Sequence, residues 1–407
     1  MTTDQTLVVV GASLAGAKAA VGAREKGFDG RIVLVGDETG LPYERPPLSK
    51  GVLRGELDAT TTEVAGLDQY QEQGIELLSG RSVEVVDVAG RQVTLDGGVR
   101  IGFSHLVLAT GASVRRLEAP GAELHGVHHL RTRDDALRLG EAIRSGGRVA
   151  VIGAGWIGSE VAASAREMGA DVVLIDPGPT PLHTVLGGEV GSIFADLHRD
   201  HGVHLRMGVG VTELRGNGKV RAVLLSDGMV EPADVVVVGI GVRPRTELAR
   251  AAGLRVDDGV VVDQRLQTEV PGVYAAGDVA AAWHPHYQRH VRVEHWANAQ
   301  HQGATAGANV AGADQTYDRI PYFFSDQFDL GMEYVGLGRP DDDVVIRGSV
   351  EERELIAFWH RDGRVTAAMN VNVWDVVDDL RALVTSRVRV DPDRLRDPDV
   401  ALAELAV

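Results

Sequence analysis

The chain has 407 residues, enough for two to three domains with a large buried core, and it contains no run of about 20 apolar residues that a membrane-spanning helix requires. Its formal net charge of -17 opposes binding to nucleic acid, because repulsion from phosphates would have to be overcome by a local basic patch. The absence of cysteine excludes a redox-active disulfide, a thiolate nucleophile, a cysteine-held iron–sulfur cluster and a cysteine zinc site, so any redox chemistry needs a bound organic cofactor.

The chain opens with a strand–helix–strand pattern. An apolar run at 7–10 leads into G-A-S-L-A-G at 11–16, an alanine-rich helix follows, and a second apolar run at 31–35 comes just before Asp37. A glycine turn at the start of a helix is typical of a site for a dinucleotide pyrophosphate. This turn departs from the usual fingerprint at Ser13, where glycine is common, although a hydroxymethyl group is small and can itself bond a phosphate oxygen. We expect cofactor contacts from Gly11, Ser13, Leu14, Ala15 and Gly16, with Asp37 at a ribose; the alternative is a glycine turn without a ligand.

A proline-stiffened loop and several strands come next. The loop R-P-P-L-S-K occupies 45–50, and strand-like segments follow at 75–78, 82–88, 92–95 and 104–108. The last strand ends on the small residues Ala109, Thr110 and Gly111. Such an ending leaves room for a nucleotide across the carboxyl end of the strand, where open α/β sheets bind ligands.

The strongest motif lies near the middle of the chain. An apolar run at 149–152 leads into G-A-G-W-I-G at 153–158, and a helical pattern follows. In this motif Gly153 permits the tight turn, Gly155 lets the backbone approach a pyrophosphate, and Gly158 allows close packing of helix and strand. The sequence therefore predicts a second dinucleotide site.

Asp176 indicates which dinucleotide this second site prefers. It ends the next expected strand, at 171–175, where a carboxylate suits the ribose diol of NAD(H). A carboxylate repels a 2'-phosphate, and residues 177–180 contain no arginine or lysine, so we predict NADH over NADPH. Further on, Gly239, Ile240 and Gly241 follow a valine-rich strand and repeat the small-residue ending at 109–111, which indicates two similar modules in series.

The last part of the chain holds a second group of candidate residues and a change of character. Gly277 and Asp278 follow a short strand, and a histidine-containing segment that runs from His284 to Asn298 leads to a helix from Ala299. Those histidines could suggest a metal site, but an irregular loop with flanking arginines is more often solvated surface, and we expect no metal. From about residue 322, short alternating strands and a helix at 376–385 indicate a small α+β domain.

Taken together and in this order, these motifs resemble the FAD-dependent, NADH-linked ferredoxin reductases of bacterial oxygenase systems. The resemblance covers essentially the whole chain and is carried by segments 11–16, 45–50, 109–111, 130–132, 153–160, 276–278 and 324–327. It implies an α/β, glutathione-reductase-like fold with two Rossmann-type dinucleotide-binding domains and a C-terminal α+β domain. The implied boundaries are a split FAD-binding domain at 1–111 and 242–321, an NADH-binding domain at 112–241 and a C-terminal domain at 322–407.

The resemblance also implies site residues beyond the two glycine turns. For FAD these are Arg45, Pro46, Lys50, Val83, Ala109, Thr110, Gly111, Arg131, Gly277, Asp278, Glu294, His295, Trp296 and Phe324. For NADH they are Gly153, Gly155, Trp156, Ile157, Gly158, Glu160, Asp176, Gly239, Ile240 and Gly241.

Lys50 and Glu160 are the catalytic candidates. The resemblance pairs a glutamate just beyond the second glycine turn with a lysine beside flavin N5, where a cation would favour the anionic reduced flavin. The alternative is two unrelated residues, with Glu160 merely placed on an early helical turn where acids favour the helix dipole.

The function implied by the resemblance is hydride transfer from NADH to FAD, then transfer of single electrons to a [2Fe–2S] ferredoxin that feeds a cytochrome P450 or a Rieske-type oxygenase. Two alternatives stay open: an NADH oxidase or diaphorase, and a redox-responsive interaction protein resembling apoptosis-inducing factor. We expect a cytoplasmic protein, monomeric or weakly dimeric, that binds neither nucleic acid nor membrane.

Overall fold

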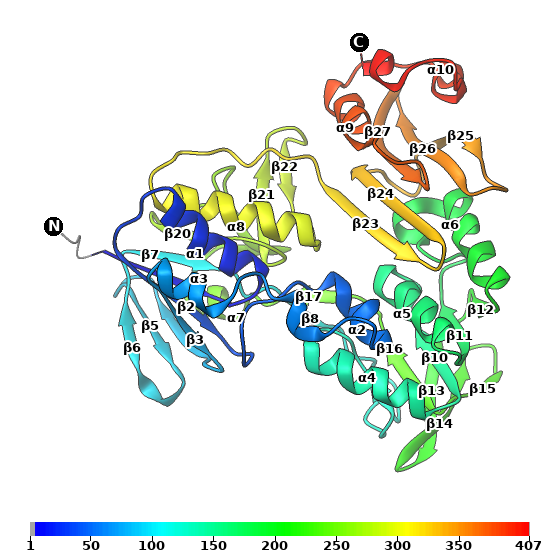
Figure 1. Ribbon diagram of the computed structural model, residues 1–407, viewed down its shortest axis with the longest axis horizontal. Helices are drawn as coiled ribbons and strands as arrows, with labels where there is room; N and C mark the ends of the chain where they lie inside the picture. The colour runs from blue at the N-terminus through cyan, green and yellow to red at the C-terminus, as the bar shows by residue number, and fades with distance from the viewer. Residues whose placement is uncertain (1–4, 407) are drawn as a thin grey trace. The chain divides into compact units, whose positions relative to one another are not determined.

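In the computed structural model, which describes residues 5–406, the chain forms two compact units. The first unit takes in the chain up to Glu44, then Thr60–Ser113 and Arg243–Arg319. The second unit takes in Arg45–Ala59, Val114–Val242 and the chain from Ile320. Each unit draws on distant parts of the sequence, as the mixed colours of its elements show (Figure 1).

The first unit is built on a parallel five-stranded sheet with the order β20-β7-β1-β2-β3. Its strands are β1 (Thr6–Val10), β2 (Arg31–Gly36), β3 (Ile75–Ser79), β7 (His105–Leu108) and β20 (Val273–Ala275). The central strands are almost fully buried apolar runs, because helices or other segments cover both faces of a parallel sheet. The strand before Gly277 thus lies in the same sheet as the N-terminal strands.

Helices α1 (Leu14–Glu25) and α8 (Trp296–Val310) pack side by side in the first unit (Figure 1). Small residues make this close approach possible. A Cβ at Gly303 would lie 2.3 Å from the Ala15 carbonyl oxygen, and one at Gly307 would lie 2.1 Å from the Ala19 carbonyl oxygen. Any side chain at either position would separate the two helices.

Smaller elements complete the first unit. An antiparallel sheet contains β4 (Val83–Asp87), β5 (Gln92–Leu95) and β6 (Arg100–Gly102), and a mixed sheet, with β19 and β21 parallel, has the order β18-β19-β21-β22. The strands of the latter are β18 (Val256–Asp257), β19 (Gly259–Val262), β21 (Ala280–His284) and β22 (Arg289–Val291). The short helices are η2 (Ala59–Thr62), α3 (Leu67–Glu72), η3 (Asp96–Gly98) and α7 (Glu247–Ala251).

The second unit repeats the parallel architecture with the strand order β12-β11-β10-β16-β9. These strands are β9 (Val127–His128), β10 (Arg148–Ile152), β11 (Asp171–Asp176), β12 (His204–Met207) and β16 (Val235–Val238). Its helices are α4 (Arg133–Ser145), α5 (Trp156–Glu167) and α6 (His183–Asp200), and β13 (Val211–Asn217), β14 (Lys219–Leu225) and β15 (Val230–Pro232) form a small antiparallel sheet. Two short strands, β8 (Ala112–Val114) and β17 (Val242–Pro244), include two of the points where the chain passes between units.

The loop after Glu44 belongs to the second unit, although the expected boundaries put it inside the N-terminal FAD-binding segment. It forms η1 (Pro46–Ser49) and α2 (Gly51–Arg54). Leu53 is fully buried in one apolar cluster with Leu139 of α4, and the Ser164 hydroxyl on α5 donates to the Ser49 carbonyl oxygen over 2.7 Å. These contacts explain why the loop groups with α4 and α5.

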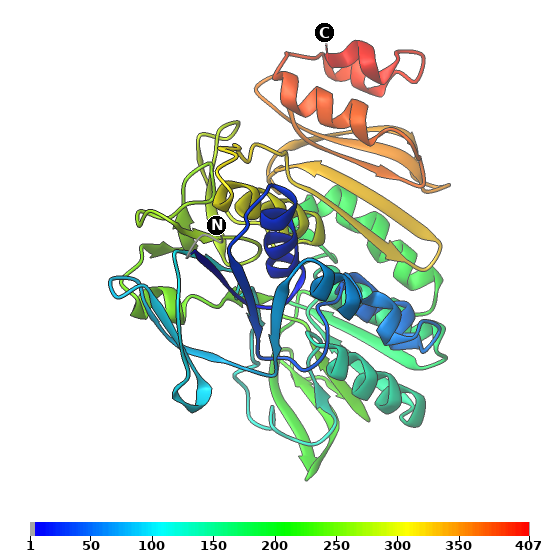
Figure 2. The same ribbon diagram turned by 60° about the vertical axis from the view of Figure 1, so that its left-hand side comes forward.

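The C-terminal part of the second unit is an antiparallel sheet with the order β23-β24-β27-β26-β25. Its strands are β23 (Tyr322–Gln327), β24 (Leu330–Gly336), β25 (Asp343–Ser349), β26 (Glu354–Arg361) and β27 (Arg364–Val371), followed by α9 (Val377–Ser386), α10 (Pro392–Arg396) and η4 (Leu402–Ala406). Figure 2 shows α9 against one face of this sheet, and apolar residues of α6 join the core on the other face. The architecture is α/β, with two Rossmann-type parallel sheets and a C-terminal α+β domain, as expected.

Candidate functional site

In the first unit the carboxyl ends of β1, β2, β7 and β20 meet at one edge of the sheet. This edge carries the turn after β1, Asp37 after β2, the segment 109–111 after β7 and Gly277 after β20. Gly11 has a φ of +111°, and a Cβ there would lie 2.1 Å from the Ala109 carbonyl oxygen. A Cβ at Gly16 would lie 1.8 Å from the Gly11 carbonyl oxygen, so only glycine permits the turn to close onto α1. Ser13 is the N-cap of α1, followed by the buried Leu14 and Ala15.

Arg245 contacts three of the predicted cofactor residues at this edge. Its Nη1 lies 3.0 Å from Asp37 Oδ2, the Thr110 hydroxyl donates to its carbonyl oxygen over 2.8 Å, and its own N–H donates to Gly111. Sequence reasoning missed Arg245, because it follows β17 on a distant stretch and nothing in its local pattern marks it as a partner of Asp37.

The segment after β20 lies at the same edge of the sheet. The Gly277 N–H donates to Gln302 Oε1 over 2.9 Å, and Arg292 bonds both the Asp278 carbonyl oxygen and the Glu294 carboxylate. His295 caps α8, accepting from the Ala297 N–H, and Trp296 begins the helix. Val83 lies instead on β4, outside this parallel sheet.

The second glycine turn, in the second unit, has the same geometry as the first. Gly153 has a φ of +101°, and a Cβ at Gly158 would lie 1.8 Å from the Gly153 carbonyl oxygen. In contrast, a Cβ at Gly155, the N-cap of α5, would meet no heavy atom within 4 Å. Gly239 N–H donates to the Ile152 carbonyl oxygen, which places Gly239, Ile240 and Gly241 beside this turn.

Asp176 is held by the turn it was predicted to accompany. One of its carboxylate oxygens accepts from the Ala154 N–H and the other from the Gly178 N–H, each over 2.7 Å. A carboxylate oxygen can accept a further hydrogen bond, so these contacts leave it able to bind a ribose hydroxyl. They also give Asp176 a structural role in shaping the glycine turn.

The two residues after Gly155 differ in environment. Trp156 lies in an aromatic group, with its ring centroid 4.8 Å from that of Phe323 and 6.2 Å from that of Phe194. Ile157 is 47% exposed. Trp156, the first residue of α5, therefore packs against α6 and the C-terminal sheet, while Ile157 is accessible from outside.

Lys50 and Glu160 form a buried ion pair within the second unit. Lys50 Nζ lies 2.8 Å from Glu160 Oε1, and the side chains are only 15% and 5% exposed. Glu160 also accepts hydrogen bonds from the hydroxyls of Ser49 and Ser325, the latter over 2.8 Å. The Lys50 ammonium lies 5.8 Å from the centre of the Phe324 ring. The structure thus joins the two catalytic candidates directly.

The proline loop supports this pair. The Pro46 carbonyl oxygen lies 3.4 Å from Lys50 Nζ, and the Arg45 guanidinium donates to the Arg131 carbonyl oxygen. Neither Ser49 nor Ser325 was among the predicted site residues, although both stand inside motifs that carry the family resemblance. Each is adjacent in the sequence to a predicted site residue, Ser49 to Lys50 and Ser325 to Phe324, and this adjacency could have identified them.

The two glycine turns fit the dinucleotides that the fold implies. At each turn, glycines fill positions where a Cβ would collide with backbone, so the backbone folds tightly enough to present its N–H groups at the amino end of a long helix. Such N–H groups and the helix dipole bind pyrophosphate. The open space at Gly155 lets a phosphate approach the backbone of α5.

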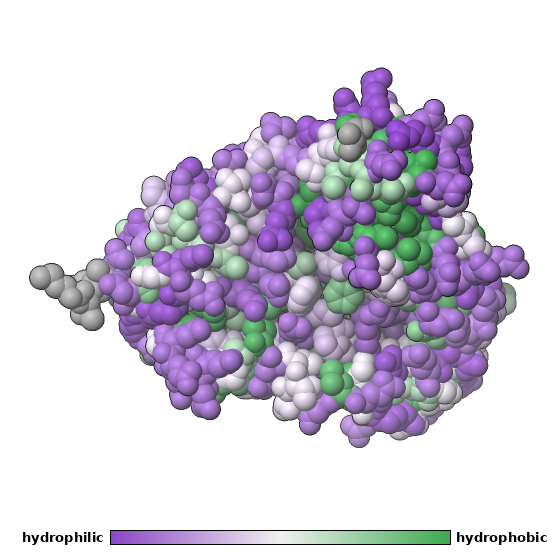
Figure 3. Space-filling model, turned by 45° about the horizontal axis from the view of Figure 1, so that its top comes forward, coloured by the Kyte–Doolittle hydropathy of each residue, from purple (hydrophilic) through white to green (hydrophobic). Residues whose placement is uncertain are grey.

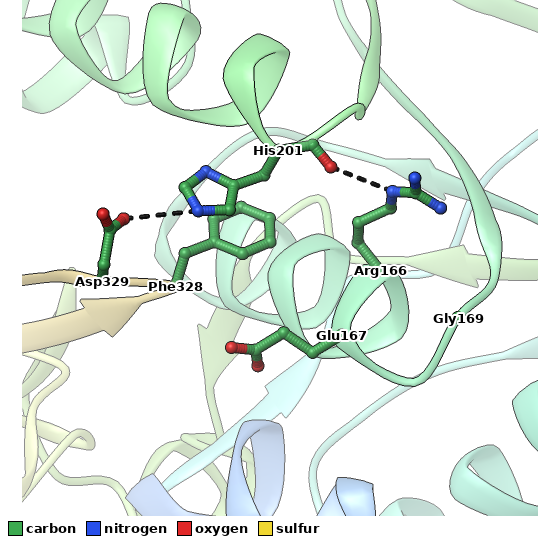
Figure 4. Close-up of a pocket in the computed structure, with 6 residues that line it drawn as sticks. All are labelled: Arg166, Glu167, Gly169, His201, Phe328 and Asp329. Carbon is green, nitrogen blue, oxygen red and sulfur yellow. Dashed lines mark hydrogen bonds and ion pairs between the residues drawn. The ribbon is translucent and has the colours of Figure 1, made fainter.

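A separate pocket of about 560 Å³ lies at the carboxyl end of α5 (Figure 4). It is lined by Arg166, Glu167, Gly169, His201, Phe328 and Asp329. The His201 ring stacks on Phe328, with centroids 4.1 Å apart. None of the predicted cofactor residues lines this pocket, so it is distinct from the candidate site.

The described residues contain no group of three or more histidine, cysteine or acidic side chains arranged to hold a metal ion. None of the helices within residues 5–406 combines the length and the apolar composition needed to cross a bilayer. Hydrophilic residues cover most of the face shown in Figure 3.

Comparison with known proteins gives matches along nearly the whole chain. Residues 5–303 match the family described as pyridine nucleotide-disulphide oxidoreductase, and residues 322–406 match the reductase C-terminal family. Rhodocoxin reductase of Rhodococcus erythropolis is 37% identical over 398 residues, which cover 98% of this chain and 93% of that protein.

Two solved structures are similar over the same extent. The ferredoxin reductase for the CYP199A2 system from Rhodopseudomonas palustris has a TM-score of 0.95 at 39% identity, covering 99% of this chain and 100% of that one. The reductase of the covalent putidaredoxin reductase–putidaredoxin complex has a TM-score of 0.95 at 36% identity, covering 100% and 98%.

Proposed function

The chain belongs to the pyridine nucleotide-disulphide oxidoreductase family, and from that premise we propose that it is the NADH-dependent reductase of a ferredoxin. The family uses FAD and NAD(H), and these are the cofactors of this chain. The observation that carries the proposal is the combination of two pyrophosphate turns with a sequence that lacks cysteine. Because the chain cannot pass electrons to a disulfide of its own, they must leave for an external acceptor.

We assign FAD to the first glycine turn and its sheet edge, and NADH to the second. FAD, when bound, supplies the step from a two-electron hydride to single electrons. The N–H groups of α1 and α5 bind the two pyrophosphates, and Asp37 and Asp176 bind ribose hydroxyls. The boundaries that go with this assignment remain an FAD-binding domain of 1–111 and 242–321, an NADH-binding domain of 112–241 and a C-terminal domain, with Arg45–Ala59 packed on the NADH side.

Lys50 has the electrostatic role in the proposal. Its ammonium would lie beside the flavin, where positive charge favours the reduced cofactor, and Glu160 holds the ammonium in one orientation through the 2.8 Å ion pair. The burial of the pair strengthens this interaction, because little water screens it. Phe324 packs on the same ammonium and restricts its movement further.

The acceptor we propose is a [2Fe–2S] ferredoxin that feeds a cytochrome P450 or a Rieske-type oxygenase. Support comes from the similarity to rhodocoxin reductase and to a reductase that was solved in complex with putidaredoxin. A monomer or weak homodimer is part of the same proposal.

The test of this acceptor is NADH-driven reduction of a panel of [2Fe–2S] ferredoxins, followed with cytochrome c and compared with turnover on oxygen. Rapid turnover with oxygen and slow turnover with every ferredoxin would favour an NADH oxidase, and a long-lived reduced complex that dimerises would favour an interaction protein.

Replacing Lys50 by alanine tests the catalytic assignment. We expect flavin reduction by NADH to slow at least tenfold, because the buried cation is lost, while FAD stays bound. Stopped-flow absorbance of the flavin measures the rate. Lys219→Ala, which removes an exposed lysine of the same unit, is the matched control and should reduce at the wild-type rate. Equal rates in Lys50→Ala and the control would overturn the assignment.

A further inference from the structure

Strand β23 of the C-terminal domain reaches the buried ion pair through Ser325. The Ser325 side chain is 1% exposed, and its hydroxyl donates to Glu160 Oε1, the same oxygen that Lys50 Nζ approaches. The two residues are 165 positions apart in the sequence. The C-terminal domain therefore supplies one of the three donors to the Glu160 carboxylate, the others being Ser49 and Lys50.

Ser325 is itself held by two further buried side chains. Gln327 Nε2 donates to Ser325 Oγ over 3.2 Å, and the Gln327 amide oxygen lies 2.9 Å from His198 Nε2 on α6. Gln327 is 1% exposed and His198 is fully buried. We refer to His198, Gln327, Ser325 and Glu160 as the Glu160 hydrogen-bond chain.

Each hydrogen bond of the Glu160 hydrogen-bond chain is donated in the direction of the Glu160 carboxylate. His198 Nδ1 is buried and meets no hydrogen-bond partner among the described residues. Since buried N–H groups without an acceptor are rarer than buried acceptors without a donor, the ring proton lies on Nε2 and is donated to Gln327. Gln327 then donates to Ser325, whose single hydroxyl hydrogen is free for Glu160. With the hydrogen bonds reversed, the lone pairs of Ser325 would face the lone pairs of the Glu160 carboxylate.

We propose that Ser325 is a positioning residue for the Lys50–Glu160 pair, and that Gln327 and His198 fix its hydroxyl in the donating orientation. A buried carboxylate is tolerated only when its lone pairs are satisfied, so the Glu160 hydrogen-bond chain keeps the Glu160 carboxylate turned toward Lys50. The C-terminal domain thereby sets the position of the cation. Any effect of the Lys50 position on the flavin rests on the proposed function, which places Lys50 beside the flavin.

The sequence makes Lys50 easy to follow chemically. The chain contains only four lysines, at positions 18, 26, 50 and 219. Brief acetylation of the FAD-loaded protein with acetic anhydride, followed by mass spectrometry of peptides, gives the reactivity of the Lys50 amine relative to the other three. An amine held against a carboxylate reacts slowly, so this ratio reports how firmly the pair is held.

We expect Ser325→Ala to raise the relative reactivity of Lys50 at least threefold, because Glu160 is no longer oriented. Gln327→Met, which removes the donor to Ser325 with little change of volume, should raise it in the same direction but less. In a Glu160→Gln background, Ser325→Ala should add nothing. Because the prediction is tested with several variants, it can still be checked if one of them fails to fold.

Thr366→Val is the matched control. Thr366 donates its hydroxyl to Asp342 in the same C-terminal domain, and that carboxylate is also buried and paired with an arginine. The control should leave Lys50 reactivity at the wild-type ratio. Unchanged or lower Lys50 reactivity in Ser325→Ala, or a rise that persists in the Glu160→Gln background, would overturn the proposal.

A second readout separates this inference from the function on which it rests. If Lys50 lies beside the flavin, Ser325→Ala should lower the midpoint potential of bound FAD by the equivalent of a threefold to tenfold change in equilibrium constant, about 14 to 30 mV for a two-electron couple. A change in Lys50 reactivity without a change in potential would support the positioning role and refute the placement of Lys50. A change in neither would refute the positioning role alone.

Discussion

At the scale of single residues, the unusual feature is a charged pair inside the second unit. Removing two charges from water is costly, and a buried pair is stable only when further hydrogen bonds satisfy its atoms. Glu160 meets this condition through the hydroxyls of Ser49 and Ser325 in addition to Lys50. This degree of satisfaction at a buried site, next to a dinucleotide turn, distinguishes the pair from the many exposed ion pairs of the chain, which contribute little.

His198 predicts a pH dependence of stability. Burial lowers its pKa to about 4, against a smaller upward effect of the Gln327 hydrogen bond. An unfolded histidine has a pKa of about 6.5, so between these values the unfolded chain binds more protons than the folded protein. The stability contributed by neutral His198 is therefore complete above about pH 6.5 and is lost as the pH falls toward 4, by up to about 3 kcal/mol.

His198→Gln should flatten this dependence, because glutamine does not titrate but can still donate to Gln327. Thermal unfolding of the FAD-loaded protein between pH 7 and 4.5 measures the effect. Burial also lowers the pKa of His105, His128, His129 and His284, and these groups contribute equally to wild type and variant. His204→Gln, at an exposed position, is the control. Parallel curves for His198→Gln and wild type would contradict the prediction.

At the scale of elements, two glycines of the turn between β10 and α5 have different surroundings. A Cβ at Gly158 would lie 1.8 Å from the Gly153 carbonyl oxygen, whereas a Cβ at Gly155 would meet no heavy atom within 4 Å. Gly155 also has a φ of -76°, which suits any residue. Gly158 is therefore required by the packing of helix on strand, whereas packing does not require Gly155, and we propose that the approach of a ligand does.

Alanine at Gly158 should affect the stability of the protein, and alanine at Gly155 should affect the binding of NADH. Gly158→Ala should lower the free energy of unfolding by about 1–3 kcal/mol, the usual cost of overpacking. Gly155→Ala should unfold like wild type and weaken NADH binding at least tenfold, because its methyl group occupies the space that a phosphate needs. Chemical denaturation and NADH titration measure the two quantities. Each variant is the control for the other, and wild-type NADH affinity in Gly155→Ala would show that the pyrophosphate does not approach there.

At the scale of the whole molecule, the chain contains two similar parallel sheets, each with a glycine turn at the carboxyl end of its central strand. The first unit is assembled from the chain up to Glu44, Thr60–Ser113 and Arg243–Arg319, and the packing of α1 on α8 joins the first of these segments to the last. A ligand bound at the shared strand ends contacts both segments at once. Occupation of this edge should therefore stabilise the unit as a whole.

Removal of FAD tests this expectation. The apoprotein should melt at a lower temperature, and FAD restored at a hundred times its Kd should add about 2.7 kcal/mol of stability. Differential scanning calorimetry at several FAD concentrations gives the result. FMN lacks the adenosine half that the turn at 11–16 would hold, so it should stabilise much less. A melting temperature independent of FAD would mean that the edge is not a cofactor site.

Much of the fold followed from local pattern. Apolar runs mark the buried parallel strands, and glycines at positive φ mark both turns, so the strands of the two dinucleotide modules and the helix at 376–385 were predicted close to their observed limits. Helix α6 was missed because Gly187, with a φ of +77°, interrupts its helical pattern. Strand β23 was not given limits of its own, although short strands were expected from about residue 322, because its polar residues Ser325, Asp326 and Gln327 do not alternate as an ordinary surface strand does.

The sequence by itself determined the two glycine turns, the acids that follow the neighbouring strands and the absence of thiol chemistry, since each depends on residues that are adjacent in the chain. Only the tertiary structure decided that the loop at Arg45–Ala59 packs with the second unit and that Ser49, Lys50, Ser325 and Glu160 meet. The physical reason is that a local pattern specifies backbone conformation and burial, whereas a hydrogen bond between residues 165 positions apart depends on how whole elements pack.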